Sequence, residues 1–170
     1  ATQDALTHAQ SAVQASEPVN LGFKPEHMDV VRNGLVGVVT SGTSARVFTG
    51  AGYTSAGKTG TAQAVTIGQK EKYNAAKMSE YQRDHALYMA YAPAEAPKIA
   101  VAVVVENAGF GAASAAPIAR RVFDYWLLGQ YPSEEDIAAT QKGQTASPVG
   151  TPRAKKDVPL NSAKNRVAED

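Results

Sequence analysis

The chain has 170 residues, of which 44% are hydrophobic and 7% aromatic, enough to form the core of one globular domain. Its net charge of +1 argues against nucleic acid or anionic lipid as the main partner, and no apolar run reaches the roughly 18 residues that a membrane span needs. The absence of cysteine excludes disulfides and thiolate metal sites and fits an oxidising compartment, while His8, His27 and His85 are too scattered for a metal cluster.

One helix is predicted in the first fifty residues. Residues 1–23 favour a short helix or a loop, whereas the segment 25–39 opens with Pro25, which suits the first helical position. Gly34 and Gly37 weaken this helix by about 1 kcal/mol each relative to alanine, so their presence predicts close packing there. Four apolar residues recur at helical spacing and give the helix one apolar face: Met28, Val31, Leu35 and Val38.

The segment from residue 45 to residue 84 predicts two short strands and a long connection. Residues 45–49 favour the first strand. Residues 62–67 alternate small or polar with apolar side chains, which predicts the second strand, and Gly68 ends it. Residues 69–84 are polar and charged, and they predict a surface connection with a helical turn at 75–82.

Residues 85–91 and 98–106 are apolar and both predict strands. The linker between them is short enough for an antiparallel hairpin. The second strand is apolar at nearly every position, so both of its faces should be covered. A helix is then predicted between an N-cap at Ser114 and a stop at Gly129, and it should cover one face of the sheet.

The composition changes from about residue 132 onwards. Residues 141–170 contain six basic and three acidic residues, three prolines and no aromatic residue. Such a segment cannot bury enough apolar surface to offset the conformational entropy lost on ordering. The sequence therefore predicts two parts, a domain over residues 1–131 and a disordered, mildly basic tail over residues 132–170.

The stretch from Ala51 to Gln63 fits three motif patterns at once. The first is a phosphate-binding loop from Gly52 to Thr59. This motif needs a helix after its last residue, because the helix N-terminus supplies much of the anion site. Gly60 is a poor first-turn residue, and the residues beyond it predict a strand. Nucleotide binding therefore remains an alternative interpretation.

The second pattern is a nucleophile pair formed by Ser55 and Lys58. A serine and a lysine three residues apart meet on a helix, where positions i and i+3 are neighbours. On a strand the same spacing places them on opposite faces. The strand-like flanks favour Ser55 as a turn or strand-entry residue.

The third pattern is Lys58-Thr59-Gly60-Thr61 on a strand, which suits a peptide that carries a carboxylate. Lys58 supplies positive potential, and the two threonines supply hydrogen-bond donors. Gly60 lets the substrate approach the backbone. A Lys-Thr-Gly tripeptide also recurs by chance, so the surrounding sequence must decide whether this one is a binding motif or only the start of an exposed strand.

The context resembles the C-terminal half of the transpeptidase domain of class B penicillin-binding proteins of the elongation type, such as penicillin-binding protein 2. This resemblance covers roughly residues 20–130, in the order helix, Lys-Thr-Gly strand, polar connection, strand hairpin and final helix. The resemblance implies an α+β fold, an antiparallel sheet covered by helices as in serine β-lactamases. The segments that carry it are 31–39, 56–63, 73–77, 83–85, 100–111 and 117–121.

The resemblance implies a serine-type D,D-transpeptidase that cross-links peptidoglycan stem peptides ending in D-Ala-D-Ala, in cell-wall elongation and cell-shape maintenance. Lys58 would tune the electrostatics of the proton relay that serves the serine. Thr59 and Thr61 would bind the terminal carboxylate of the stem peptide, with Gly60 beside them. The Thr61 N–H would be one oxyanion-hole donor, an interaction worth about 3–4 kcal/mol in a related reaction class.

The implied partners are stem peptides, lipid-linked precursor strands, β-lactams in the full-length enzyme and membrane proteins of the elongation complex. The resemblance implies no cofactor, no metal and no nucleic acid. It also implies the periplasmic face of the bacterial inner membrane, with an anchor outside this chain.

The chain departs from the family pattern because two of the family's motifs are absent upstream of the motif strand. Neither the Ser-x-x-Lys motif of the nucleophile nor a Ser-x-Asn motif occurs in residues 1–54. The chain also begins with alanine and shows no signal peptide. We therefore expect a fragment that is inactive alone and has an exposed strand edge prone to association. A noncatalytic interaction domain is a third interpretation.

Overall fold

The computed structural model describes residues 2–3, 6–11, 17, 19–66, 73–74, 77–144 and 146–158. The chain forms two compact units, residues 1–30 and 31–170. No helix in the described ranges has the length and apolar character needed to cross a membrane. The helices and strands of the chain, with 3-10 helices labelled η, are β1 Thr2–Gln3, β2 Gln10–Ser11, α1 Pro25–Thr40, α2 Ala45–Phe48, β3 Ala56–Ala62, η2 Glu80–Gln82, β4 His85–Ala92, β5 Ile99–Val105, α3 Gly111–Ser114, α4 Ala116–Leu128, β6 Gln130–Tyr131, α5 Glu134–Gln141, β7 Arg153–Ala154 and η3 Lys155–Asp157.

The first unit holds a small antiparallel pair, β1 with β2, in which Thr2 lies opposite Ser11. The sequence did not predict these two strands. Helix α1 confirms the predicted helix and begins at Pro25. The close packing expected at Gly34 and Gly37 is wrong, because a Cβ atom at either position would meet no described atom within 4 Å.

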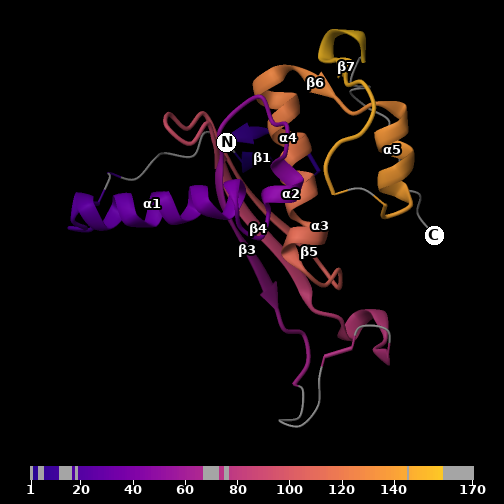
Figure 1. Cartoon of the computed structure of the whole chain (residues 1–170), viewed down its shortest axis with the longest axis horizontal. Helices are drawn as coiled ribbons and strands as arrows, with labels where there is room; N and C mark the ends of the chain where they lie inside the picture. The colour runs from indigo at the N-terminus through magenta and orange to yellow at the C-terminus, as the bar shows by residue number, and fades with distance from the viewer. Residues whose placement is uncertain are drawn as a thin grey trace. The chain divides into compact units, whose positions relative to one another are not determined.

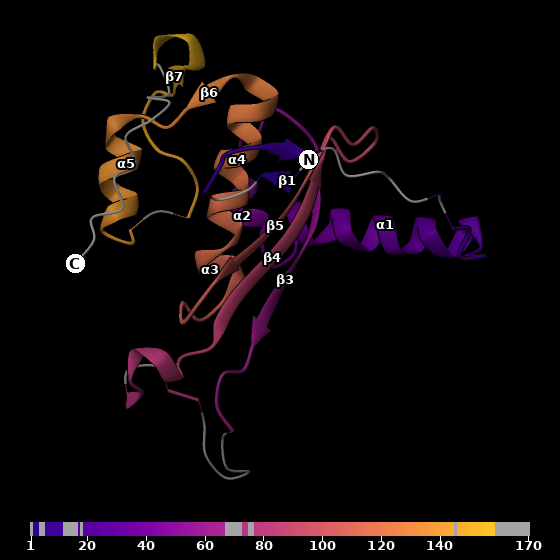
Figure 2. The same ribbon diagram turned by 180° about the vertical axis from the view of Figure 1, so that it is seen from behind.

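The second unit is built on a three-stranded antiparallel sheet in the order β3-β4-β5 (Figure 1). The hairpin of β4 and β5 confirms the prediction, with Tyr88 opposite Val103. The even-numbered residues of β4 are buried beneath α3 and α4, which lie on one face of the sheet (Figure 2). The fold is therefore the predicted α+β arrangement of an antiparallel sheet with helices.

The other face of the sheet is open in the described part of the chain. Val104 on β5 is 62% exposed and Met89 on β4 is 49% exposed. Exposed and half-buried residues alternate along β5 from Ile99 to Val105. The expectation that both faces of this strand are covered is therefore wrong for these residues, although the strand is apolar throughout.

Aromatic side chains fill the core between the sheet and α4. Phe48 stacks on Tyr88 with 6.1 Å between ring centroids and lies 6.4 Å from Phe123. Phe48 belongs to α2, so the strand predicted over residues 45–49 is wrong. Burial of Val47 and Phe48 against α4 favours one helical turn here over the extended conformation that the local pattern suggested.

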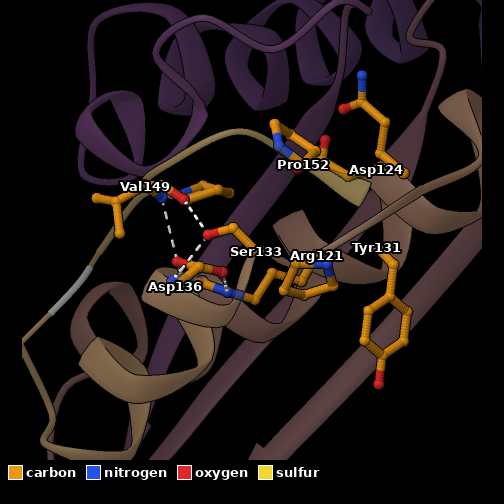
Figure 3. Close-up of a pocket in the computed structure, with 10 residues that line it drawn as sticks. Arg121, Asp124, Tyr131, Ser133, Asp136, Val149 and Pro152 are labelled. Carbon is orange, nitrogen blue, oxygen red and sulfur yellow. Dashed lines mark hydrogen bonds and ion pairs between the residues drawn. The ribbon is translucent and has the colours of Figure 1, made fainter. Parts of the chain in front are cut away.

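The segment after α4 is folded as far as residue 158, contrary to the predicted disorder. Asp136 on α5 is fully buried and accepts two hydrogen bonds from Arg121, at 2.8 and 2.7 Å (Figure 3). The Ser133 hydroxyl caps α5 by accepting from Asp136 N–H and donates to the Val149 carbonyl. Composition alone could not predict that this segment is ordered, because one buried ion pair and one helix cap stabilise it in place of a large apolar core. Residues 159–170 lie outside the described residues.

We predict that Asp136→Ala lowers the free energy of unfolding by about 3 kcal/mol, because it removes the fully buried carboxylate that pairs with the half-buried Arg121 guanidinium. Urea unfolding of the purified chain measures this loss. Glu134→Ala is the matched control. Glu134 also pairs with an arginine, Arg153, but its side chain is 78% exposed, so a change of at most about 1 kcal/mol is expected. Equal losses in both variants would contradict the buried role of Asp136.

Candidate functional site

The motif residues Lys58 to Thr61 lie in the middle of β3, which runs from Ala56 to Ala62. The predicted strand over residues 62–67 is therefore wrong in its bounds, because pairing starts earlier and ends at Ala62. The strand is aligned with β4 along its whole length, with Lys58 opposite Met89 and Thr61 opposite Ala86. This ladder fixes the register of the motif.

The stretch from Gly52 to Thr59 does not have the structure of a phosphate-binding loop. Its last four residues are already in β3, and the chain continues as a strand beyond Thr59. No helix begins there, so no helix N-terminus can supply the anion site that such a loop needs. The nucleotide-binding alternative has no support in the fold.

Ser55 and Lys58 do not form a nucleophile pair. Ser55 is 3% exposed, and its Oγ atom has no hydrogen-bond partner among the described residues. Lys58 is exposed, and its Nζ atom donates to the carbonyl of Thr59 at 2.9 Å. The preference for Ser55 as a strand-entry residue agrees with its position directly before Ala56.

The three motif side chains, those of Lys58, Thr59 and Thr61, lie on two faces of the sheet. Residues directly opposite each other in adjacent strands share a face, so Lys58 lies on the open face with Met89. Thr59 lies opposite Tyr88 on the helix-covered face, and its Oγ1 atom is 3.2 Å from that of Thr43. A ligand that touches residues of both sets must therefore lie along the outer edge of β3.

Within the described sheet, β3 is an edge strand that pairs only with β4. The helix-covered side of this edge is held by Tyr88, whose hydroxyl lies 3.0 Å from the Ser44 Oγ atom. Burial raises the pKa of Tyr88 above its ordinary value, which keeps the hydroxyl neutral. Ser44 also donates to the Val38 carbonyl, so this bond joins the end of α1 to the sheet behind the motif.

Two glycines that sequence reasoning did not single out permit close packing at the motif strand. A Cβ atom on Gly111 of α3 would lie 2.1 Å from the Leu87 carbonyl oxygen and 2.6 Å from that of Gly60. A Cβ atom on Gly57 would lie 2.7 Å from the Tyr88 hydroxyl. Both positions therefore need glycine for steric reasons.

The C-terminal end of β3 is fixed by Asp84, a second group that sequence reasoning missed. Asp84 is 8% exposed, and its Oδ1 atom accepts from Ala64 N–H at 3.3 Å. Its backbone carbonyl accepts from Gly109 N–H at 2.8 Å, and its N–H donates to the Tyr73 hydroxyl. The only signal in the sequence is a charged residue placed directly before an apolar strand.

The N-terminal approach to β3 is fixed by a buried polar network on α4. Arg120 bonds both carboxylate oxygens of Asp124 at 2.9 Å, and its Nη1 atom donates to the carbonyls of Val47 and Thr49. The Tyr53 hydroxyl donates to Asp124 at 2.9 Å. Burial, and then the Asp124 carboxylate, raise the pKa of Tyr53 well above its ordinary value, so it stays a hydrogen-bond donor.

The chain matches the family described as "Penicillin binding protein transpeptidase domain" over residues 2–124. It is 43% identical over 109 residues to the peptidoglycan D,D-transpeptidase MrdA of Haemophilus influenzae, covering 63% of this chain and 17% of that protein. It is 37% identical over 119 residues to MrdA of Escherichia coli K12, covering 69% and 19%. The chain thus spans less than a fifth of the length of these relatives.

Solved structures agree with this match. Pseudomonas aeruginosa PBP2 in complex with WCK 5153 gives a TM-score of 0.55 at 37% identity, covering 71% of this chain and 24% of that one. The complex of Helicobacter pylori PBP2 with MreC gives a TM-score of 0.53 at 25% identity, covering 69% and 21%.

We predict that Gly111→Ala destabilises the chain by about 1–3 kcal/mol and shifts the amide resonances of Gly60 and Leu87, because the new methyl group must push α3 away from the sheet backbone. Urea unfolding and a two-dimensional amide NMR spectrum measure both effects. Gly37→Ala is the matched control and should stabilise the chain by up to about 1 kcal/mol, since its Cβ meets no described neighbour. A neutral Gly111→Ala would contradict the close approach.

Proposed function

This chain belongs to the penicillin-binding protein transpeptidase family, and on that basis we propose that the protein containing it is a peptidoglycan D,D-transpeptidase. The proposed reaction joins stem peptides. A serine attacks the penultimate carbonyl of a D-Ala-D-Ala stem, the terminal D-Ala leaves, and the amine of a neighbouring stem takes the acyl group. The observation that carries the proposal is the Lys58-Thr59-Gly60-Thr61 motif on an edge strand, in a chain that matches the family over residues 2–124.

The hydrogen bonding of β3 supports a role for its backbone in binding. In an antiparallel pair, residues alternate between those that bond to the partner strand and those whose N–H and C=O point away from it. The Thr59 carbonyl accepts from Lys58 Nζ, which is consistent with Thr59 being one of the outward-pointing residues. By the same alternation the Thr61 N–H also faces the free edge. An oxyanion-hole donor needs this direction.

We assign the remaining roles by residue. Lys58 provides positive charge beside the proton relay, and its contact with Thr59 lies at the same edge. The Thr59 and Thr61 hydroxyls bind the terminal carboxylate. Gly60 has no side chain to block the approach of an extended peptide, and the strand edge can pair with the backbone of such a peptide.

The nucleophile is proposed to lie outside this chain. Ser55 is buried, and its Oγ atom makes no hydrogen bond to Lys58 or to any other described residue, so it does not take that role. The chain covers 17% of one relative and 19% of another, and so the serine and the opposite wall of the cleft are assigned to the remainder of the protein. The chain alone is therefore proposed to be inactive.

We further propose that the protein acts in cell-wall elongation and shape maintenance at the periplasmic face of the inner membrane. Its proposed partners are lipid-linked precursor strands, β-lactams as acylating inhibitors, and membrane proteins of the elongation complex. The structure of Helicobacter pylori PBP2 with MreC supports the last of these by analogy. The boundary of the transpeptidase portion near residue 131 is also proposed; the family match ends at residue 124.

We predict that Lys58→Ala in the full-length protein slows acylation by a fluorescent penicillin by about 10²-fold or more, the scale expected for losing one preorganised charged or polar group. Rates of labelling, read by gel fluorescence, measure this. Lys98→Ala is the control, because Lys98 is also exposed but lies in the β4–β5 connection. The 170-residue chain alone should not be labelled, and labelling mapped to Ser55 would refute the proposal.

A further inference from the structure

The loop of residues 107–110 leads from the end of β5 to α3 and ends beside the motif strand. A Cβ atom on Gly111, the first residue of α3, would lie 2.6 Å from the Gly60 carbonyl oxygen and 3.1 Å from the Gly60 nitrogen. The Gly60 carbonyl and the Thr61 N–H belong to one planar peptide group. The path of this loop therefore affects the direction of the Thr61 N–H, the proposed oxyanion-hole donor.

Three hydrogen bonds hold residues 107–109 of this loop. Two run from its N–H groups to the start of β4, and one runs from α3 to a loop carbonyl. They join Asn107 N–H to His85 Nδ1 at 3.0 Å, Gly109 N–H to the Asp84 carbonyl at 2.8 Å, and the Ser114 hydroxyl to the Ala108 carbonyl at 2.8 Å. Only the first of these three bonds uses a side chain of the sheet, so a substitution of His85 changes the hold of the sheet on the loop directly.

The bond to His85 lies where the chain turns away from β5. Asn107 has a φ of 56°, in the left-handed region that asparagine adopts more readily than most residues other than glycine. Its side-chain Oδ1 atom is buried and has no hydrogen-bond partner among the described residues, so this atom does not hold the turn. The turn is held by the backbone N–H, which donates to His85.

The direction of this hydrogen bond fixes the state of the imidazole ring. A backbone N–H can only donate, so the Nδ1 atom of His85 must accept and can carry no proton. The neutral ring then has its proton on Nε2, and an imidazole protonated on both nitrogens has no acceptor left. The turn therefore needs a lone pair at this one position.

We propose, on the basis of the proposed function, that His85 is a positioning residue for the transpeptidase reaction. Its Nδ1 atom fixes the turn at Asn107. The loop in turn holds Gly111 against the peptide group that joins Gly60 and Thr61. An oxyanion-hole donor must be aimed before the reaction begins, and misplacing a positioned group by about 1 Å can slow a reaction by roughly 10²-fold.

His85 acts through the loop and is assigned no step with the substrate. It lies opposite Ala62, one position beyond the motif residues Lys58 to Thr61. It belongs to the segment 83–85, one of those that carry the resemblance to the family. Its role explains why a histidine stands at the first position of β4, next to the apolar residues that follow it.

The test compares the full-length protein with three variants in their acylation by a fluorescent penicillin. His85→Phe keeps a ring but removes the acceptor, and it should lower the limiting rate at saturating penicillin by about tenfold or more. His85→Asn places an amide oxygen near the position of Nδ1, and it should restore the limiting rate to within about threefold of the wild type. His27→Phe, at an exposed histidine of α1, is the matched control and should change neither the limiting rate nor the half-saturating concentration.

Rescue by asparagine separates a positioning role from a merely structural one. Equal limiting rates in His85→Phe and the wild type, or equally slow His85→Phe and His85→Asn variants, would overturn the proposed role of His85. A wild type that is not acylated at all would instead show that the proposed function is wrong, and the role of His85 would fall with it.

A second measurement needs neither activity nor a folded His85→Phe variant. In NMR spectra of the imidazole nitrogens of the 170-residue chain, His85 should show an unprotonated Nδ1 and a protonated Nε2. His85→Asn should leave the amide resonance of Gly111 near its wild-type position. A proton on the Nδ1 atom of His85 would contradict the proposed role.

Discussion

A buried guanidinium group holds together the part of the structure on which the motif strand depends. Arg120 is 6% exposed, and its partners are the Asp124 carboxylate on the same helix and two carbonyls at the end of α2. A buried charge without partners is strongly destabilising. The chain must therefore leave α2 along a path on which the carbonyls of Val47 and Thr49 reach the Arg120 guanidinium. Asp124 then binds the Tyr53 hydroxyl, which sets the turn that leads into β3. One ion pair thus sets the start of the strand.

The geometry of β3 follows from this anchor and from close backbone packing. Tyr88 and Ser44 hold one side of the strand, Gly111 brings α3 onto its backbone, and Asp84 fixes its far end. None of these contacts uses the outer edge. In the described sheet the edge therefore keeps the N–H and C=O groups that an extended peptide could pair with, on a strand whose position is constrained at both ends.

Several features could be predicted from local patterns. The helix that starts at Pro25, the hairpin of β4 and β5, and the end of α4 at Leu128, directly before Gly129, follow from periodicity and turn residues. The predicted N-cap at Ser114 is wrong, because α4 begins at Ala116 with Ala115 as its N-cap. Other predictions failed where a distant contact decides. Residues 45–48 became helical because Phe48 packs on Tyr88 and Phe123, and residues 134–141 became ordered because Arg121 pairs with Asp136. A window of neighbouring residues contains no information about such partners.

The sequence by itself determined the family and the motif strand, because Lys58 to Thr61 and the surrounding segments form a specific order of residue types along the chain. Only the tertiary structure decided how these residues are presented. It placed Lys58 and Thr59 on opposite faces of β3, excluded a helix after Thr59, and left the Ser55 hydroxyl buried without a hydrogen-bond partner among the described residues. The physical reason is that face, edge and burial depend on strand register and on long-range packing against α4, which local residue preferences do not specify.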